Sequence, residues 1–262
     1  MNSRVEPLER IVVVVPVHDE ERLLGSALAH IRPAMDRAEN HKRLRTRLIV
    51  VLDACTDGSA SIAASAAAAD TRISVVTTDA RCVGAARALG VAAATAGCPG
   101  PSLPRWWVAN TDADTRVPPD WLELFAEAAD AGADALVGTV EPDIAELGPA
   151  RFAAWRSAYV RAECHPHIHG ANLGVRASAY RDAGGFQPVP GNEDVGLVRA
   201  LRACGATVRS SGEPQVVTSA RLRGRTAHGF AGYLSSLPAP GGIGDAIACE
   251  ETQFVDTVGH RP

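Results

Sequence analysis

The sequence predicts an α/β protein built on a mostly parallel, doubly wound sheet with helices on both faces. Short apolar runs rich in valine and isoleucine alternate with helical segments through the first half of the chain, as they do in βαβ units. These runs are continuous instead of alternating with polar residues, which is typical of parallel strands buried on both faces. Ligands of such a sheet collect at the carboxyl ends of its strands.

Four strands, each followed by a helix, are expected in order along the first half. Pro16 closes the first apolar run, the turn sequence Asp57-Gly58 precedes the second helix, and Pro118-Pro119 opens the fourth. The expected strands are residues 11–15, 47–52, 73–77 and 106–110, and the expected helices are residues 20–36, 59–69, 84–96 and 118–131.

The second half is less regular, and we expect it to complete the same domain. Neither a repeat nor a linker interrupts the chain, so one domain is expected over residues 1–236. Residues 237–262 would be a proline- and glycine-rich C-terminal tail, serving as a loose cover or as a dimer arm that makes a homodimer. The expected elements are strands 134–140, 170–176, 207–209 and 215–218, and helices 144–163 and 193–204.

Composition narrows the classes of partner and the compartment. The formal net charge is −4, which argues against nucleic acid as a partner because phosphate binding needs a basic face. The six cysteines form no CxxC pair, so a zinc knuckle is disfavoured and a reducing, cytoplasmic compartment is expected. No apolar run approaches the roughly 20 residues of a membrane span, and the start of the chain has no signal-peptide pattern.

Asp112-Ala113-Asp114 is the strongest candidate site. Two carboxylates follow a buried strand directly, so both can point into one crevice at the strand end. Hard cations such as Mg²⁺ and Mn²⁺ prefer oxygen ligands, and a diphosphate would supply further oxygens. An isolated pair of this kind is more often a turn or a helix cap. Its place after the strand favours a metal site.

Polar residues also follow the first two strands. His18 and Glu20 come after the first strand, at a helix N-terminus that favours anionic ligands. Asp53 ends the second strand and could accept from a pyrimidine N–H or from ribose hydroxyls, whereas Asp57 is equally well explained as a turn residue. The chain lacks both GxGxxG after its first strand and the GxxxxGK[ST] loop, which disfavours dinucleotide-binding and P-loop folds.

Taken in order, these segments resemble the family 2 glycosyltransferases of the GT-A fold over residues 11–210. Two later segments add to the resemblance, one before and one at the start of the helix expected at residue 193. The matching segments are Pro16 to Glu20, Asp53 to Ser59, Gly84 to Arg87, Asp112 to Asp114, Gly170 to Leu173 with Arg176 and Gly184-Gly185-Phe186, and Gly191 to Asp194.

The resemblance implies a glycosyltransferase that moves one sugar from a UDP- or GDP-sugar to an acceptor hydroxyl with Mn²⁺ or Mg²⁺. Residues 11–120 would be the nucleotide-binding half and 121–236 the acceptor half. Asp194 would be the general base, with Glu193 as its rival, and a base opposite the leaving group implies inversion. The implied donor-binding residues are Pro16, His18, Glu20, Asp53, Arg87, Asp112 and Asn172; the implied metal ligands are Asp112, Asp114 and, by analogy, His228.

Two further patterns are left with open roles. Arg221, Arg223 and Arg225 alternate, so an extended chain would place them on one side, where they could clamp a diphosphate or form an ordinary basic strand. His165, His167 and His169 would likewise share one face of an extended strand. Supporting carboxylate or cysteine spacing is absent, so contact of His169 with the acceptor is favoured over a metal site.

Two other functional classes compete with this interpretation. A nucleotidyltransferase of related fold would need a glycine-rich loop where the chain has Pro16-Val17-His18. A non-catalytic relative that only binds nucleotide-sugar would not need to keep Asp112, Asp114 and the Glu193-Asp194 pair. The QxxRW motif of processive, membrane-bound members is missing, which favours transfer of a single sugar. The sugar, the acceptor and the oligomeric state are left open.

Overall fold

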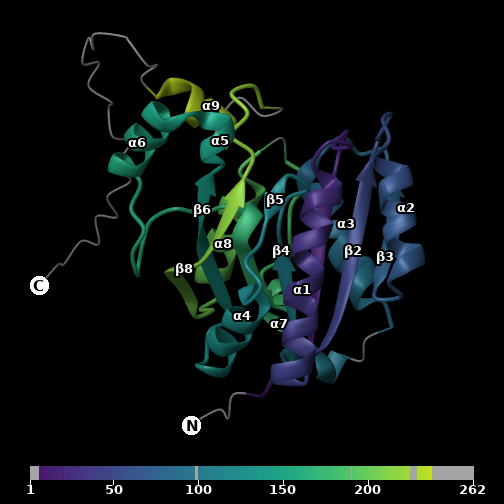
Figure 1. The fold of residues 1–262 in the computed structure, drawn as a ribbon. Coiled ribbons are helices and arrows are strands. Elements are labelled where there is room, and N and C mark those ends of the chain that lie inside the picture. The colour runs from purple at the N-terminus through teal and green to yellow at the C-terminus, as the bar shows by residue number, and fades with distance from the viewer. Residues whose placement is uncertain (1–5, 98–99, 190, 225–228, 238–262) are drawn as a thin grey trace, which may run out of the picture.

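The computed structural model describes residues 6–97, 100–189, 191–224 and 229–237. An eight-stranded sheet with helices around it forms the body of the molecule (Figure 1). Its strands are β1 (Arg10–Val17), β2 (Arg45–Asp53), β3 (Ile73–Thr78), β4 (Trp106–Asn110), β5 (Thr115–Arg116), β6 (Ala135–Pro142), β7 (Leu173–Arg176) and β8 (Val208–Thr218).

The strand order is β3-β2-β1-β4-β7-β6-β8-β5. The first four strands are parallel, which confirms the fold class expected for the first half. β7 runs antiparallel to both of its neighbours, β4 and β6, and β6 is parallel to β8. The sheet is therefore mixed, and β7 is the strand that joins its two halves.

Helices cover both faces of the sheet. The α1, α2 and α4 helices share one apolar core with the sheet, whereas α3, α7 and α8 pack against the opposite face. Three short helices, α5, α6 and α9, pack together beyond one end of the sheet (Figure 1). The helices are α1 (Leu24–Lys42), α2 (Ser59–Ala69), α3 (Val83–Thr95), α4 (Trp121–Asp130), α5 (Ile144–Leu147), α6 (Pro149–Ala158), α7 (Ala177–Asp182), α8 (Glu193–Ala203) and α9 (Phe230–Ser236), with 3₁₀ turns at Gly100–Arg105 and Gly170–Asn172.

The uninterrupted apolar sequence of strand β1 is explained by burial on both faces of the sheet. Successive side chains of a strand point to opposite faces. Val13 and Val15 enter the core under α1, and Val12 and Val14 enter the core under α3. All four are fully buried, so a polar residue at any of these positions would lose its water without gaining a partner.

Several element boundaries differ from the expected ones. The first helix begins at Leu24 instead of residue 20, because residues 18–21 form a turn in which the Glu20 N–H donates to Ser59 Oγ. The helix expected over residues 144–163 is broken at Gly148, whose φ of 82° suits glycine, and α6 restarts at Pro149. The two short strands expected at 207–209 and 215–218 are parts of β8, which contains a register shift opposite β6.

Within the described residues, no helix combines the length and the apolar character that crossing a membrane requires.

Candidate active site

A cavity of about 1320 Å³ opens at the carboxyl ends of β1, β2 and β4. Side chains that follow these strands line one side of it, as expected for this class of sheet. The opposite side is formed by the end of α6, the segment before β7, the start of α8 and α9. Nearly all of the residues singled out from the sequence therefore border one space.

Asp112 and Asp114 lie in this cavity, and each is paired with an arginine. Asp112 Oδ1 is 2.5 Å from Arg87 Nη2. Asp114 Oδ2 pairs with Arg221 Nη2, and its Oδ1 accepts from the hydroxyls of Thr115 and Thr218 at 3.3 Å. The two carboxylates are therefore held in place by separate elements, with Asp112 bound to α3 and Asp114 bound to β5 and the segment after β8.

Arg87 is the central cation of the site and is 2% exposed. Besides Asp112 it donates to the Gly170 carbonyl at 3.0 Å, and its Nε is 3.4 Å from Glu193 Oε1. Gly170 makes this possible, because a Cβ there would lie 2.7 Å from Arg87 Nη2. The guanidinium thus joins the Asp112 loop, the segment before β7 and the start of α8. It organises these acidic groups and also lines the cavity, so its expected contact with the nucleotide or phosphate stays a prediction.

The acidic side of the cavity carries an excess of negative charge. Burial raises the pKa of Asp112 to about 6; Arg87 opposes this rise, while the charges of Asp114, Glu193 and Asp194 add to it. Six carboxylates and three arginines are among the described lining residues. A cation placed beside Asp112 would lower the free energy of its ionised form.

Glu193 and Asp194 open helix α8 but have different surroundings. Glu193 is 7% exposed and tied to Arg87. Asp194 lines the cavity, where its Oδ2 accepts from the Gly170 N–H at 2.6 Å and its Oδ1 from the Val195 N–H at 2.8 Å. Each carboxylate oxygen has two lone pairs, so Asp194 keeps acceptor capacity toward the cavity. Of the two, Asp194 is the carboxylate that is not paired with Arg87.

Pro16, His18, Glu20 and Asp53 all line the opposite end of the cavity. Both Asp53 oxygens accept backbone N–H bonds at 2.8 Å, from Arg81 and Cys82, and His18 Nδ1 is 2.5 Å from the Asp53 carbonyl oxygen. Asp53 therefore also fixes the loop between β3 and α3 against the end of β2. Glu20 pairs with Arg221 at 2.7 Å, which links the loop after β1 to the segment after β8.

Asn172 is the predicted donor-binding residue that the structure places elsewhere. Its side chain is fully buried, donates to the carbonyls of Thr139 and Pro214 and accepts from Trp121 Nε1. These bonds use the amide inside the protein, and Asn172 is not among the residues that line the cavity. We therefore assign it to the interior, where it joins β6, β8 and α4.

Of the three alternating arginines, Arg221 reaches the cavity and Arg223 is exposed away from it. The chain bends at residues 222–223 instead of extending, so Arg221 and Arg223 do not share one side as expected. Arg225 and His228 lie outside the described residues.

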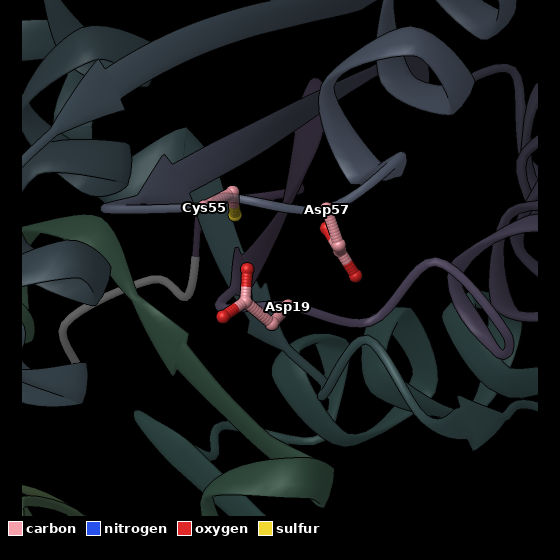
Figure 2. A group of neighbouring side chains, drawn as sticks. All are labelled: Asp19, Cys55 and Asp57. Atoms are coloured by element: carbon pink, nitrogen blue, oxygen red, sulfur yellow. The ribbon is translucent and has the colours of Figure 1, made fainter.

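A second acidic group lies beside the cavity. Figure 2 shows Asp19 opposite Cys55 and Asp57, and the ligand atoms of these three residues lie within 4.8 Å of one another. Backbone N–H groups already bind both carboxylates: Asp19 accepts from Thr56, and Asp57 accepts from Glu21 and Ser59. Burial raises the pKa of the Cys55 thiol, which disfavours the thiolate that metals bind. These hydrogen bonds hold the loops after β1 and β2 together, which explains why the three side chains are close to one another.

Sequence reasoning missed several residues of the cavity wall. Tyr159, Phe230, Tyr233 and Arg81 all line the cavity. Tyr159 falls inside the helix that was expected to continue to residue 163, and α9 was not expected at all. The glycine and proline at positions 148 and 149 are the signal that could have shown the break in that helix.

Solved glycosyltransferases share this fold. The mannosyltransferase PcManGT from Pyrobaculum calidifontis, in complex with GDP-Man and Mn²⁺, has a TM-score of 0.60 and 22% identity over 84% of this chain and 61% of its own. TarS 1–349 from S. aureus has a TM-score of 0.56 and 14% identity over 80% of this chain and 60% of its own. GalNAc-T7 with UDP, GalNAc and Mn²⁺ has a TM-score of 0.60 and 12% identity over 91% of this chain and 46% of its own. The chain thus spans about 60% or less of the length of these proteins. A search of curated protein sequences finds no match.

The mixed α/β fold is therefore the GT-A fold of these solved glycosyltransferases. The chain belongs to glycosyl transferase family 2, whose model matches residues 12–172.

Proposed function

We propose that this glycosyltransferase moves a single sugar from a UDP- or GDP-sugar to an acceptor hydroxyl, with Mn²⁺ or Mg²⁺ and with inversion at the anomeric carbon. One observation carries the proposal. The Asp112–Asp114 pair and Asp194 border the same cavity, and Arg87 ties Asp112 to the Gly170 segment that also binds Asp194. A leaving group and an attacking group can therefore meet in one space.

The donor end of the cavity suits a nucleotide. Pro16, His18, Glu20 and Asp53 border it, and Asp53 retains lone pairs beyond its two backbone bonds. PcManGT is solved with GDP-Man and Mn²⁺, and GalNAc-T7 with UDP, GalNAc and Mn²⁺. These neighbours support either uracil or guanine as the base of the donor nucleotide. The donor sugar would be selected by side chains that differ between the proteins.

A divalent cation fits the acidic side of the cavity, where negative charge is in excess. Asp112 and Asp114 would hold it. In the described part of the chain they have no third histidine, cysteine or carboxylate close enough to complete a site, so the donor diphosphate would supply further oxygens. The ion would neutralise the charge that develops on the departing diphosphate. Arg221, now bound to Asp114 and Glu20, would then be available to the same diphosphate.

The transfer itself needs one proton acceptor and one leaving group. Asp194 would take the proton of the acceptor hydroxyl while that oxygen bonds to the anomeric carbon. The bond from the anomeric carbon to the diphosphate oxygen breaks at the same time, and the nucleoside diphosphate leaves with that electron pair. Attack from the side opposite the leaving group inverts the anomeric configuration.

Asp194→Asn tests the proposal, because the amide keeps the shape and can still accept from Gly170 but is no longer a base. We expect release of UDP or GDP from a panel of UDP- and GDP-hexoses, with simple alcohols and glycosides as acceptors, to fall by about 10²- to 10⁴-fold. The rise in melting temperature caused by UDP or GDP with Mn²⁺ should be unchanged.

The matched control is Asp182→Asn, at an exposed carboxylate outside the cavity, which should keep full activity. Full activity of Asp194→Asn would remove Asp194 as the base. A wild-type protein whose melting temperature responds to neither nucleotide with metal would contradict the donor assignment.

A further inference from the structure

Five aromatic and imidazole rings form one wall of the cavity. This wall is separate from the one that the proposed donor-binding residues border. Tyr159 ends α6, His167 and His169 precede the turn before β7, and Phe230 and Tyr233 belong to α9. The Tyr159 and His167 rings stack with centroids 4.1 Å apart and planes 8° apart, and His169 meets the edge of Phe230 at 5.8 Å. We call these five residues the ring wall.

The ring wall lies next to the proposed base. His169 immediately precedes Gly170, whose N–H is bound by Asp194 at 2.6 Å. The cavity is continuous from the Asp112–Asp114 pair past Asp194 to Tyr233. A molecule resting on the ring wall would therefore present its near side to Asp194 and to the donor sugar.

The ring wall is uncharged. Burial lowers the pKa of His169 to about 3 and that of His167 below its ordinary value, so both rings are neutral at pH 7. None of the three arginines among the described lining residues belongs to the ring wall, and two of them are paired with carboxylates, Arg87 with Asp112 and Arg221 with Asp114. The nearby Arg161 is paired with Glu213. An anionic acceptor would find no counter-charge on this wall.

The ring wall also offers hydrogen-bonding groups. Nε2 of His169 bonds to the Tyr159 hydroxyl at 3.0 Å, and Nε2 of His167 accepts from the Val160 N–H at 3.3 Å. Within the described residues, neither imidazole uses its Nδ1. A hydrocarbon acceptor would leave these nitrogens unpaired, which costs free energy when they are buried. A sugar ring matches both features, because its C–H face meets aromatic faces and its hydroxyls meet the nitrogens.

We propose that the ring wall is a subsite for the ring of a neutral sugar, so that the acceptor is an uncharged glycoside. The proposal rests on the proposed function, since it names the acceptor class of the same site. Tyr233 is the most accessible member, with 39% of its surface exposed, and it can be truncated with little effect on the core.

Saturation-transfer NMR on the full chain with UDP and Mg²⁺ tests the subsite. The probes are methyl α-glucopyranoside and methyl α-mannopyranoside, with glucose 6-phosphate as the anionic probe and cyclohexanol as the apolar one. The neutral glycosides should receive the strongest transfer at their ring C–H protons. Tyr233→Ala should weaken their binding about fivefold or more, and Tyr233→Phe, which keeps the ring, should preserve it within about twofold. Ser235→Ala, on the exposed side of the same helix, is the matched control and should bind as wild type.

Each other outcome overturns the subsite. These are no transfer to either glycoside, equal binding by Tyr233→Ala, or stronger binding of glucose 6-phosphate or cyclohexanol than of the glycosides. His169→Gln provides a second test, because it should also weaken glycoside binding if Tyr233→Ala fails to fold. The UDP and Mg²⁺ thermal shift reports the donor site separately. A shift without glycoside binding leaves the proposed function standing and removes only the subsite.

Discussion

Burying a guanidinium costs several kcal/mol unless partners neutralise it and bind its N–H groups. Asp112 and the Gly170 carbonyl accept from the Arg87 guanidinium, and Glu193 adds a negative charge 3.4 Å from Nε without a hydrogen bond. Asp112 is partly exposed, whereas Glu193 is buried. Removing the cation therefore leaves the Glu193 charge buried and without its main neutralising partner.

This dependence predicts a large loss of stability for Arg87→Ala. The free energy of unfolding should fall by about 3–5 kcal/mol, the range seen when one partner of a buried ion pair is removed. Urea denaturation followed by circular dichroism measures it. Arg181→Ala is the control, because Arg181 and its partner Asp182 are both exposed, and it should cost less than about 1 kcal/mol. A loss of under about 1 kcal/mol for Arg87→Ala would show that its contacts are not energetically coupled.

For single residues, the sequence predicts where a side chain lies in the fold better than it predicts which groups that side chain contacts. Asp112 and Asp114 could be placed because they directly follow a strand, and strand ends meet at one edge of a sheet. The partners that Arg87 and Asn172 have inside the protein were not predicted. Such partners are set by which neighbours a side chain meets once distant segments pack, and residue spacing carries no information about that.

Among the elements, strands were easier to predict than the ends of helices. A continuous run of buried valines, as in β1, can hardly be anything but a strand between two helical layers. Helix α1 instead begins after the turn at Glu20 and passes through Pro33 to Lys42, because its packing against α4 outweighs the disruption by proline. Helix α9 has seven residues, and its place depends on contact with α5 and α6, so its own sequence gives little signal.

The packing of α1 against α4 leads to a prediction about pH. Glu123 of α4 accepts from Arg37 Nε at 2.9 Å and from His41 Nδ1 at 2.8 Å, both on α1. Burial alone would raise the pKa of Glu123, but these two bonds outweigh it and hold the pKa below its ordinary value of 4.5. A carboxylate with a lowered folded-state pKa contributes stability above its ordinary pKa and loses it as pH falls through the lowered value. Glu123→Gln should therefore lower the free energy of unfolding by about 1 kcal/mol at pH 7.

Below about pH 4.5 this difference between wild type and Glu123→Gln should shrink toward zero, as measured by urea denaturation across the pH range. Glu127→Gln is the matched control on the same two helices. Glu127 pairs with Lys42 but is 57% exposed, so its substitution should have a smaller effect at every pH. A difference between wild type and Glu123→Gln that stays constant from pH 7 to pH 3 would contradict the assignment.

For the whole molecule, the first and second halves of the chain share one sheet. β4, from the first half, pairs with β7, from the second, with Trp107 opposite Arg176 and Asn110 opposite Leu173. Trp107 and Trp121 lie in one apolar cluster that also contains the α1 side chains, so the largest core spans both halves, while two smaller clusters lie within the second half. The cavity between the halves therefore has its geometry set by the same packing that holds the protein together.

This arrangement predicts that the described body of the chain unfolds as one unit. Tryptophan fluorescence reports on four tryptophans, of which Trp107 and Trp121 lie in the shared core, whereas far-ultraviolet circular dichroism reports on helices and strands throughout. In urea the two signals should change at the same midpoint, because β4 cannot lose β7 without exposing the core that α1 and α4 share. UDP with Mn²⁺ should shift both midpoints equally, since a ligand that binds between the halves stabilises both. Two separate transitions, or a ligand shift confined to one signal, would show that the halves fold independently and that the cavity can open without global unfolding.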